Sequence, residues 1–183
     1  MARYEDFQYQ RYSFEEMVGV PQPLPAAIGE VALSFSDLEQ NASGKIATLL
    51  HADPVASSAV TAQLSFKAKL DLLASLIKLH FPHASFNVGP NDPEAALREL
   101  VAMLTMCEEL RNRAMHSTWR SSPERVGHVR RAKQTARAKH GFRQEFEDLT
   151  PGNVLDISDY IVYGSYSLDE FFLGVDLQSQ IKP

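Results

Sequence analysis

One short stretch of the sequence concentrates side chains that can do chemistry. Residues 110–119 read Leu-Arg-Asn-Arg-Ala-Met-His-Ser-Thr-Trp, so Arg111, Asn112 and His116 fall within six residues. Histidine titrates near neutral pH and can accept or donate a proton. Arginine keeps its charge and presents a planar fork that suits a phosphate as negative charge develops on it. These residue types are therefore compatible with a reaction at a phosphate.

The spacing of Arg111 and His116 limits how they can act together. Five residues of an ideal helix rotate the chain by about 500°, which leaves the two side chains about 140° apart. Asn112 and His116, four residues apart, share a helix face instead. Arg111 and His116 can therefore converge only if the helix end is distorted, or if two copies of the helix face one cleft.

The same residues could also have a purely structural role. Arg111 could pair with Glu108, and Asn112 with Glu109, on an exposed helix end. His116 could stabilise the helix C-terminus as a cation. On residue types and spacing alone, this structural interpretation is preferred.

The charge distribution points to an anionic partner. The net charge is −5, yet residues 111–143 hold ten Lys or Arg and one acid, Glu124, while the other 150 residues hold eight Lys or Arg and 22 acids. A concentrated basic stretch is typical of nucleic-acid binding. The alternative is a basic hairpin that is either solvated or docked on the acidic surface of a second subunit. The candidate phosphate contacts are Arg113, Arg120, Arg130, Arg131, Lys133, Arg137 and Lys139.

Helical periodicity predicts the elements that must position the motif. Apolar residues recur at three- and four-residue steps over residues 28–50, 57–80, 93–115 and 151–177. Asp92-Pro93-Glu94 and Thr150-Pro151 are good helix starts, with a capping side chain before a first-turn proline. Four long segments joined by short loops predict a mainly all-α, up-and-down bundle of four to five helices.

The remaining segments predict an arm, an insertion and a tail. Pro21, Pro23 and Pro25 argue against a regular helix and favour an extended link, so residues 1–27 are assigned to an N-terminal arm. Residues 28–177 then form the helical domain and 178–183 a tail. Within the domain, residues 126–139 favour a short extended or β-hairpin insertion ended by Gly141, with a basic helix as the alternative.

Several classes of protein are disfavoured. The sequence has no phosphate-binding glycine loop, no dinucleotide fingerprint and no His-Glu-x-x-His metal motif, so we expect neither a metal site nor a cofactor. No apolar run approaches the roughly 18–20 residues that span a bilayer, and we expect a cytoplasmic protein without membrane contact.

Two single residues are assigned structural roles. The lone Cys107 lies among apolar residues, which indicates a buried thiol rather than a nucleophile. Trp119 favours a core or interface anchor over a platform on which a base stacks.

The Arg111-Asn112-x-x-x-His116 pattern resembles the signature of the HEPN family. The family motif is an arginine, commonly followed by a polar residue, and a histidine four to six residues on. The stretch Leu110–Ser117 looks especially like HEPN proteins of bacterial defence and toxin loci. A helix like Phe66–Leu73 before the motif, and a basic stretch then a helix after it, extend the resemblance over roughly residues 28–175.

This resemblance implies a metal-independent endoribonuclease that works as a homodimer with a composite active site. His116 would transfer protons, Arg111 would bind the scissile phosphate, and Asn112 would orient His116 or the phosphate. The protein would be a hydrolase acting on RNA as an antiviral defence effector or toxin, with an antitoxin or regulatory protein as a candidate partner. Antitoxins that modify a tyrosine near the histidine would find Ser117, Thr118 and Trp119 there instead. The alternative is a non-catalytic HEPN-like module that binds a protein partner or nucleic acid.

Overall fold

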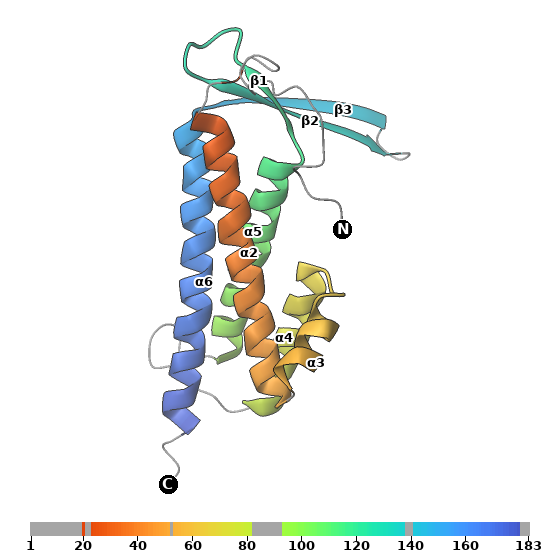
Figure 1. The fold of residues 1–183 in the computed structure, drawn as a ribbon, viewed down its shortest axis with the longest axis vertical. Coiled ribbons are helices and arrows are strands. Elements are labelled where there is room, and N and C mark those ends of the chain that lie inside the picture. Colours follow the sequence, from red (N-terminus) through yellow and green to blue (C-terminus); the bar gives the residue numbers. More distant parts are fainter. Residues whose placement is uncertain (1–19, 21–22, 52, 82–92, 138–140, 180–183) are drawn as a thin grey trace, which may run out of the picture.

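The chain forms a helical bundle with a small sheet across one end (Figure 1). The computed structural model describes residues 20, 23–51, 53–81, 93–137 and 141–179. The elements are α2 (Pro23–Leu50), α3 (Pro54–Thr61), α4 (Phe66–His80), α5 (Pro93–Met115), β1 (Thr118–Ser121), β2 (Val129–Arg137), β3 (Gly141–Leu149) and α6 (Pro151–Ser179). Among the described helices, none is both long enough and apolar enough to cross a membrane. The predicted mainly helical bundle with an extended insertion before the last helix is confirmed.

Helix α2 lies at the centre of the bundle, in contact with α4, α5 and α6. Its buried side chains recur every three or four residues: Leu24, Ala27, Val31, Phe35, Leu38, Ala42, Ile46 and Leu49. Polar contacts between α2 and α6 join residues that are a constant 124 positions apart in sequence. The pairs are Ser34 with Ser158, Asn41 with Ser165, and Lys45 with Asp169. The constant offset means that α2 and α6 run in the same direction, while α5 runs in the opposite direction and lies behind α2 in the view of Figure 1.

The prediction of an extended link through Pro25 is wrong, because α2 already begins at Pro23. The first four N–H groups of a helix have no acceptor within it, so a proline there loses no hydrogen bond. Pro23 and Pro25 both lie in this first turn. The turn is also anchored in the core, since Leu24 is fully buried.

The predicted single helix over residues 57–80 is also wrong, because the helix is interrupted between α3 and α4. The end of α3 tightens, with Gln63 N donating to Val60 O and Leu64 N to Thr61 O. Ser65 then has extended backbone, and its Oγ accepts from Ala68 N (3.2 Å) to cap α4. The apolar pattern continues across this break, which is why periodicity alone misses it.

The sheet has the order β1-β2-β3 and is antiparallel throughout. Extended structure is confirmed for Val129–Arg137, but Gly141 begins β3 instead of ending the insertion, and neither β1 nor β3 was predicted. Strand β3 has no regular apolar alternation. It forms a strand because it pairs with β2, and in this register acidic residues of β3 lie opposite basic residues of β2.

The start of α6 is confirmed at the predicted Thr150-Pro151. Thr150 Oγ1 accepts from Asn153 N (3.2 Å), while Asn153 Oδ1 accepts from Thr150 N (3.0 Å). This reciprocal capping satisfies two backbone donors at the helix start. It fixes the junction between β3 and α6.

Some sequence expectations fall outside the described residues. They concern most of the N-terminal arm (residues 1–19, 21 and 22), the capping role of Asp92, the position of Lys139, and the end of the tail at 180–183. The helix α6 itself continues to Ser179, past the predicted domain end at 177.

Helices α5 and α6 approach each other closely at Gly164. A Cβ built on Gly164 would lie 2.8 Å from Cys107 Sγ and 3.5 Å from Leu104 Cδ2, so a larger side chain cannot enter without displacing its neighbours. Cys107 is fully buried as predicted, and burial raises the pKa of its thiol to about 11. Gly164 thus serves close helix packing, although glycine in general lowers helix propensity.

Replacing Gly164 with alanine should destabilise the protein. The better helix propensity of alanine contributes up to ~1 kcal/mol, but overpacking against Cys107 costs about 1–3 kcal/mol. The matched control is Gly44→Ala in α2, where an added Cβ meets nothing within 4 Å. Urea unfolding followed by circular dichroism should show a lower midpoint for Gly164→Ala and an equal or higher one for Gly44→Ala. Equal midpoints for Gly164→Ala and wild type would contradict the close-packing argument.

Candidate functional site

The C-terminal end of α5 is held by the residues that follow it. A helix leaves its last carbonyls without intrahelical donors. Here three consecutive carbonyls are satisfied, those of Asn112, Arg113 and Ala114, by His116 N (3.0 Å), Ser117 Oγ (2.7 Å) and Trp119 Nε1 (3.0 Å). Trp119 is buried in the core, which confirms its predicted role as an anchor. His116 is therefore positioned just beyond the last helical residue.

A groove of about 740 Å³ lies between this helix end and the sheet. Its lining residues come from α5, the turn after it, β2 and β3: Met106, Glu109, Leu110, Asn112, Arg113, His116, Ser117, Arg131, Lys133 and Glu145. The exposed His116 and half-buried Asn112 both belong to it. Of the seven predicted RNA contacts, the groove brings together Arg113, Arg131 and Lys133.

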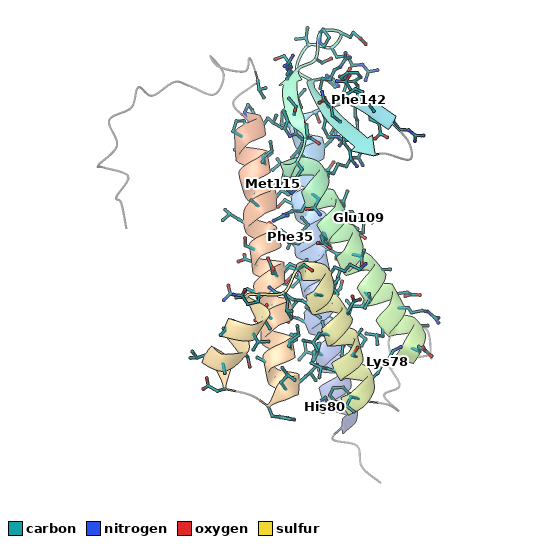
Figure 2. The ribbon with its side chains drawn as sticks, turned by 90° about the vertical axis from the view of Figure 1, so that its right-hand side faces the viewer. Phe35, Lys78, His80, Glu109, Met115 and Phe142 are labelled. Carbon is teal, nitrogen blue, oxygen red and sulfur yellow. The ribbon has the colours of Figure 1, made fainter. Side chains whose placement is uncertain are left out.

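Arg111 is not one of the residues that line the groove. Its guanidinium lies 4.8 Å from the ring centroid of Phe35 on α2, a cation–π contact. Figure 2 shows Phe35 between α2 and α5, with Glu109 on the far side of α5. Arg111 and His116 thus meet different surroundings, as their five-residue spacing indicated. Within the described part of the chain, Arg111 makes no ion pair with Glu108, and Asn112 no hydrogen bond with Glu109.

Asn112 links the two halves of the motif. Its side-chain Oδ1 accepts from Arg111 Nη1 (2.8 Å), and its backbone oxygen accepts from His116 N (3.0 Å). Because a guanidinium can only donate, this contact fixes which end of the amide faces Arg111. The Nδ2 hydrogens have no acceptor among the described residues, so they can donate to a ligand in the groove.

Glu147 on β3 joins the helix end to the sheet. It accepts hydrogen bonds from Arg113 Nη2 on α5 and from Arg131 Nε on β2 (3.0 Å). Arg131 is only 5% exposed and also donates to Ser117 Oγ (3.2 Å). Burial alone would raise the pKa of Glu147, but the hydrogen bonds from Arg113 and Arg131 outweigh it and lower that pKa. Two of the predicted RNA contacts therefore already have an anionic partner.

Arg130 lies on the opposite face of the sheet from Arg131. It donates from Nε and Nη2 to the two carboxylate oxygens of Asp148 (2.8 and 2.9 Å) and pairs with Glu124 (3.1 Å). The hydrogen bonds from Arg130 lower the pKa of Asp148 to about 2, and donating to Asp148 and Glu124 raises the pKa of Arg130 itself. Bidentate pairing of this kind is geometrically specific.

The other predicted basic residues have different settings. Arg120 on β1 and Lys133 on β2 are exposed and form no ion pair within the described residues. Arg137 belongs to β2, but its side chain, like all of Lys139, lies outside the described part. Contact of any of these residues with RNA stays a prediction.

Four residues of this region were missed from the sequence. Ser117 was within reach of sequence reasoning, because it follows His116 directly. Phe35, Glu145 and Glu147 were not, since only helix packing and strand register bring them to the motif. In the part of the chain that the structure describes, no three His, Cys, Asp or Glu side chains lie close enough to hold a metal ion.

The sheet should lose stability in acid through its paired carboxylates. A lowered pKa in the folded state means that Asp148 stabilises the fold above its ordinary value of 3.8, and that this stabilisation disappears as the pH falls through about 2. Glu147 acts in the same direction. Between pH 4 and 2, the free energy of unfolding should fall less steeply for Asp148→Asn than for wild type. Parallel slopes in urea unfolding at several pH values would contradict the assignment.

The functional interpretation rests on the groove and its motif. Comparison with known protein families, with curated protein sequences and with solved structures finds no match for this chain.

Proposed function

We propose that this protein is a metal-independent endoribonuclease of the HEPN type that acts as a homodimer. The observation that carries the proposal is the exposed imidazole of His116 in a groove shared with Asn112 and with cations of α5 and β2. A general base, an amide donor and positive charge then surround one space. These are the components that cleavage at an RNA phosphate requires.

The reaction is an internal transfer within the RNA. The 2′-oxygen attacks the adjacent phosphorus, the bond from phosphorus to the 5′-oxygen breaks, and a 2′,3′-cyclic phosphate and a 5′-hydroxyl form. One imidazole removes the proton of the 2′-OH, and an imidazolium protonates the leaving 5′-oxygen. Arg111 stabilises the negative charge that builds on the phosphate, and Asn112 holds Arg111 and donates to a phosphate oxygen.

Two subunits supply what one chain lacks. In one chain Arg111 faces α2 and Phe35, away from the groove that contains His116. A second copy related by a two-fold axis would place its own Arg111 and His116 next to those of the first copy. Such a site has two imidazoles for the acid and base roles and two guanidiniums for the charge. A nuclease of this kind would serve as a toxin or antiviral defence effector, with an antitoxin or regulator as a possible partner.

The second candidate is a non-catalytic helical module that binds a protein or nucleic acid. Its support is that Arg113 and Arg131 already pair with Glu147, and Arg111 with Phe35 and Asn112, so these three arginines have partners without a substrate. The two candidates differ in whether His116 is needed for RNA cleavage.

Wild-type protein should cleave single-stranded RNA in the presence of EDTA, and His116→Ala should reduce the rate by about 10²–10⁴-fold, the usual contribution of a proton-transfer group. His80→Ala is the matched control, because His80 is an exposed imidazole at the opposite end of the bundle (Figure 2). Mapping of product ends should find cyclic phosphates and 5′-hydroxyls. Cleavage by His116→Ala at the wild-type rate would refute the proposal and favour the binding module.

Mixed dimers should show whether the site is shared. Mixing wild-type chains with His116→Ala chains should lower the activity below the share of wild-type chains, because each mixed dimer keeps one imidazole where the reaction uses two. Light scattering should confirm that both proteins form dimers, and co-purification of differently tagged chains should confirm that they exchange subunits. Activity that falls only in proportion to the wild-type chains, with proven exchange, would mean that each chain carries a complete site.

A further inference from the structure

The sheet has an inner and an outer face that differ in character. Residues directly opposite each other in an antiparallel pair point to the same side. Trp119, Arg131 and Glu147 are on the inner side, toward the bundle and the groove. What we call the outer sheet face is the other side, formed by Thr118, Arg120, Arg130, Ala132, Gln134, Phe142, Gln144, Phe146 and Asp148.

Two aromatic rings are exposed on the outer sheet face. Phe142 and Phe146 are 65% and 59% exposed. The residue opposite Phe146 is Ala132, which is too short to cover a ring. Strands β2 and β3 extend beyond β1 and project past the helices, and Phe142 lies on this projecting part (Figures 1 and 2). Neither ring belongs to the hydrophobic core of the bundle.

Polar and cationic groups alternate with these rings. Gln134 and Gln144 stand opposite each other between the two phenylalanines. The guanidinium of Arg130 lies 5.9 Å from the Phe146 ring centroid and is held there by Asp148. Arg120, opposite Arg130, is exposed and has no ion pair among the described residues. In sequence, residues 133–143 add two lysines and two arginines without an acid.

We propose that the outer sheet face binds unpaired RNA, with bases stacked on Phe142 and Phe146 and phosphates near Arg120. Every base has a π-face, so stacking on exposed rings suits single strands and not duplexes, whose base faces are covered. Four residues of strand span roughly 13 Å, so each ring stacks a different base. The core of a protein interface is depleted of charged residues, whereas here two amides separate the rings and two guanidiniums lie next to Phe146 on its other side.

That the ligand is RNA rests on the proposed function. The outer sheet face adds that the substrate is unpaired RNA. The same two strands contribute Lys133 and Glu145 to the groove on their inner side. RNA held on the outer sheet face would thus lie on the other side of the ribbon that lines the groove. Selection of unpaired regions would come from the phenylalanines and cleavage from His116.

The test is fluorescence anisotropy with a labelled oligoadenylate and the full chain carrying His116→Ala, in EDTA, so that binding is measured without cleavage. Phe142→Ala and Phe146→Ala should each weaken binding at least about fivefold, the fold-change that corresponds to stacking of one base. Phe→Tyr variants should bind like the parent, because tyrosine still stacks, and Phe→Leu variants should resemble alanine. The control Tyr166→Ala removes an equally exposed ring from α6 and should have no effect.

A folded double variant, Phe142→Ala with Phe146→Ala, that binds as tightly as the parent would overturn the inference. So would a parent that does not bind the oligoadenylate, or phenylalanine variants that change only the oligomeric mass, which would indicate a protein interface. Equal loss of affinity for a blunt RNA duplex would also overturn it. Binding that depends on the rings without any cleavage by wild type would instead remove the proposed catalysis and leave the binding face standing.

Discussion

The carboxylate of Glu147 is the contact on which the geometry of the groove depends. It joins α5, through Arg113, to β2, through the almost fully buried Arg131. Removing one partner of a buried ion pair leaves the other charge uncompensated, which is far more costly than losing an exposed pair. Arg131 also reaches Ser117, whose hydroxyl caps the carbonyl of Arg113. The turn that carries His116 is thereby fixed between helix and sheet.

These ion pairs change what the basic stretch can offer to a ligand. The sequence from Arg111 to Arg143 is strongly basic, but β3 folds back and pairs Glu147 with Arg131 and Asp148 with Arg130. Much of the positive charge is therefore balanced within the sheet. Exposed cations such as Arg120 and Lys133 remain for an anionic partner, one on each face. Recognition of RNA would then depend on aromatic and amide groups as much as on net charge.

The motif combines a rigid part and an exposed part. Arg111 is held by Phe35 and Asn112, whereas the side chain of His116 is exposed in the groove. This arrangement fits the proposed two-subunit site, in which a preorganised guanidinium lowers the cost of ordering the phosphate. The backbone oxygen of Asn112 also accepts from His116 N, which fixes the first residue after the helix.

Local sequence signals determined the helical class, the start of α6 at Thr150-Pro151, the burial of Cys107 and Trp119, and the separation of Arg111 from His116 around the helix axis. Each depends on neighbours within a few residues, through capping, periodicity or the helical repeat. The tertiary structure alone decided the break before Ser65, the strand register, the Glu147 ion pairs and the contact of Arg111 with Phe35. These features depend on contacts between segments that are distant in sequence, and no local pattern encodes which segments come into contact.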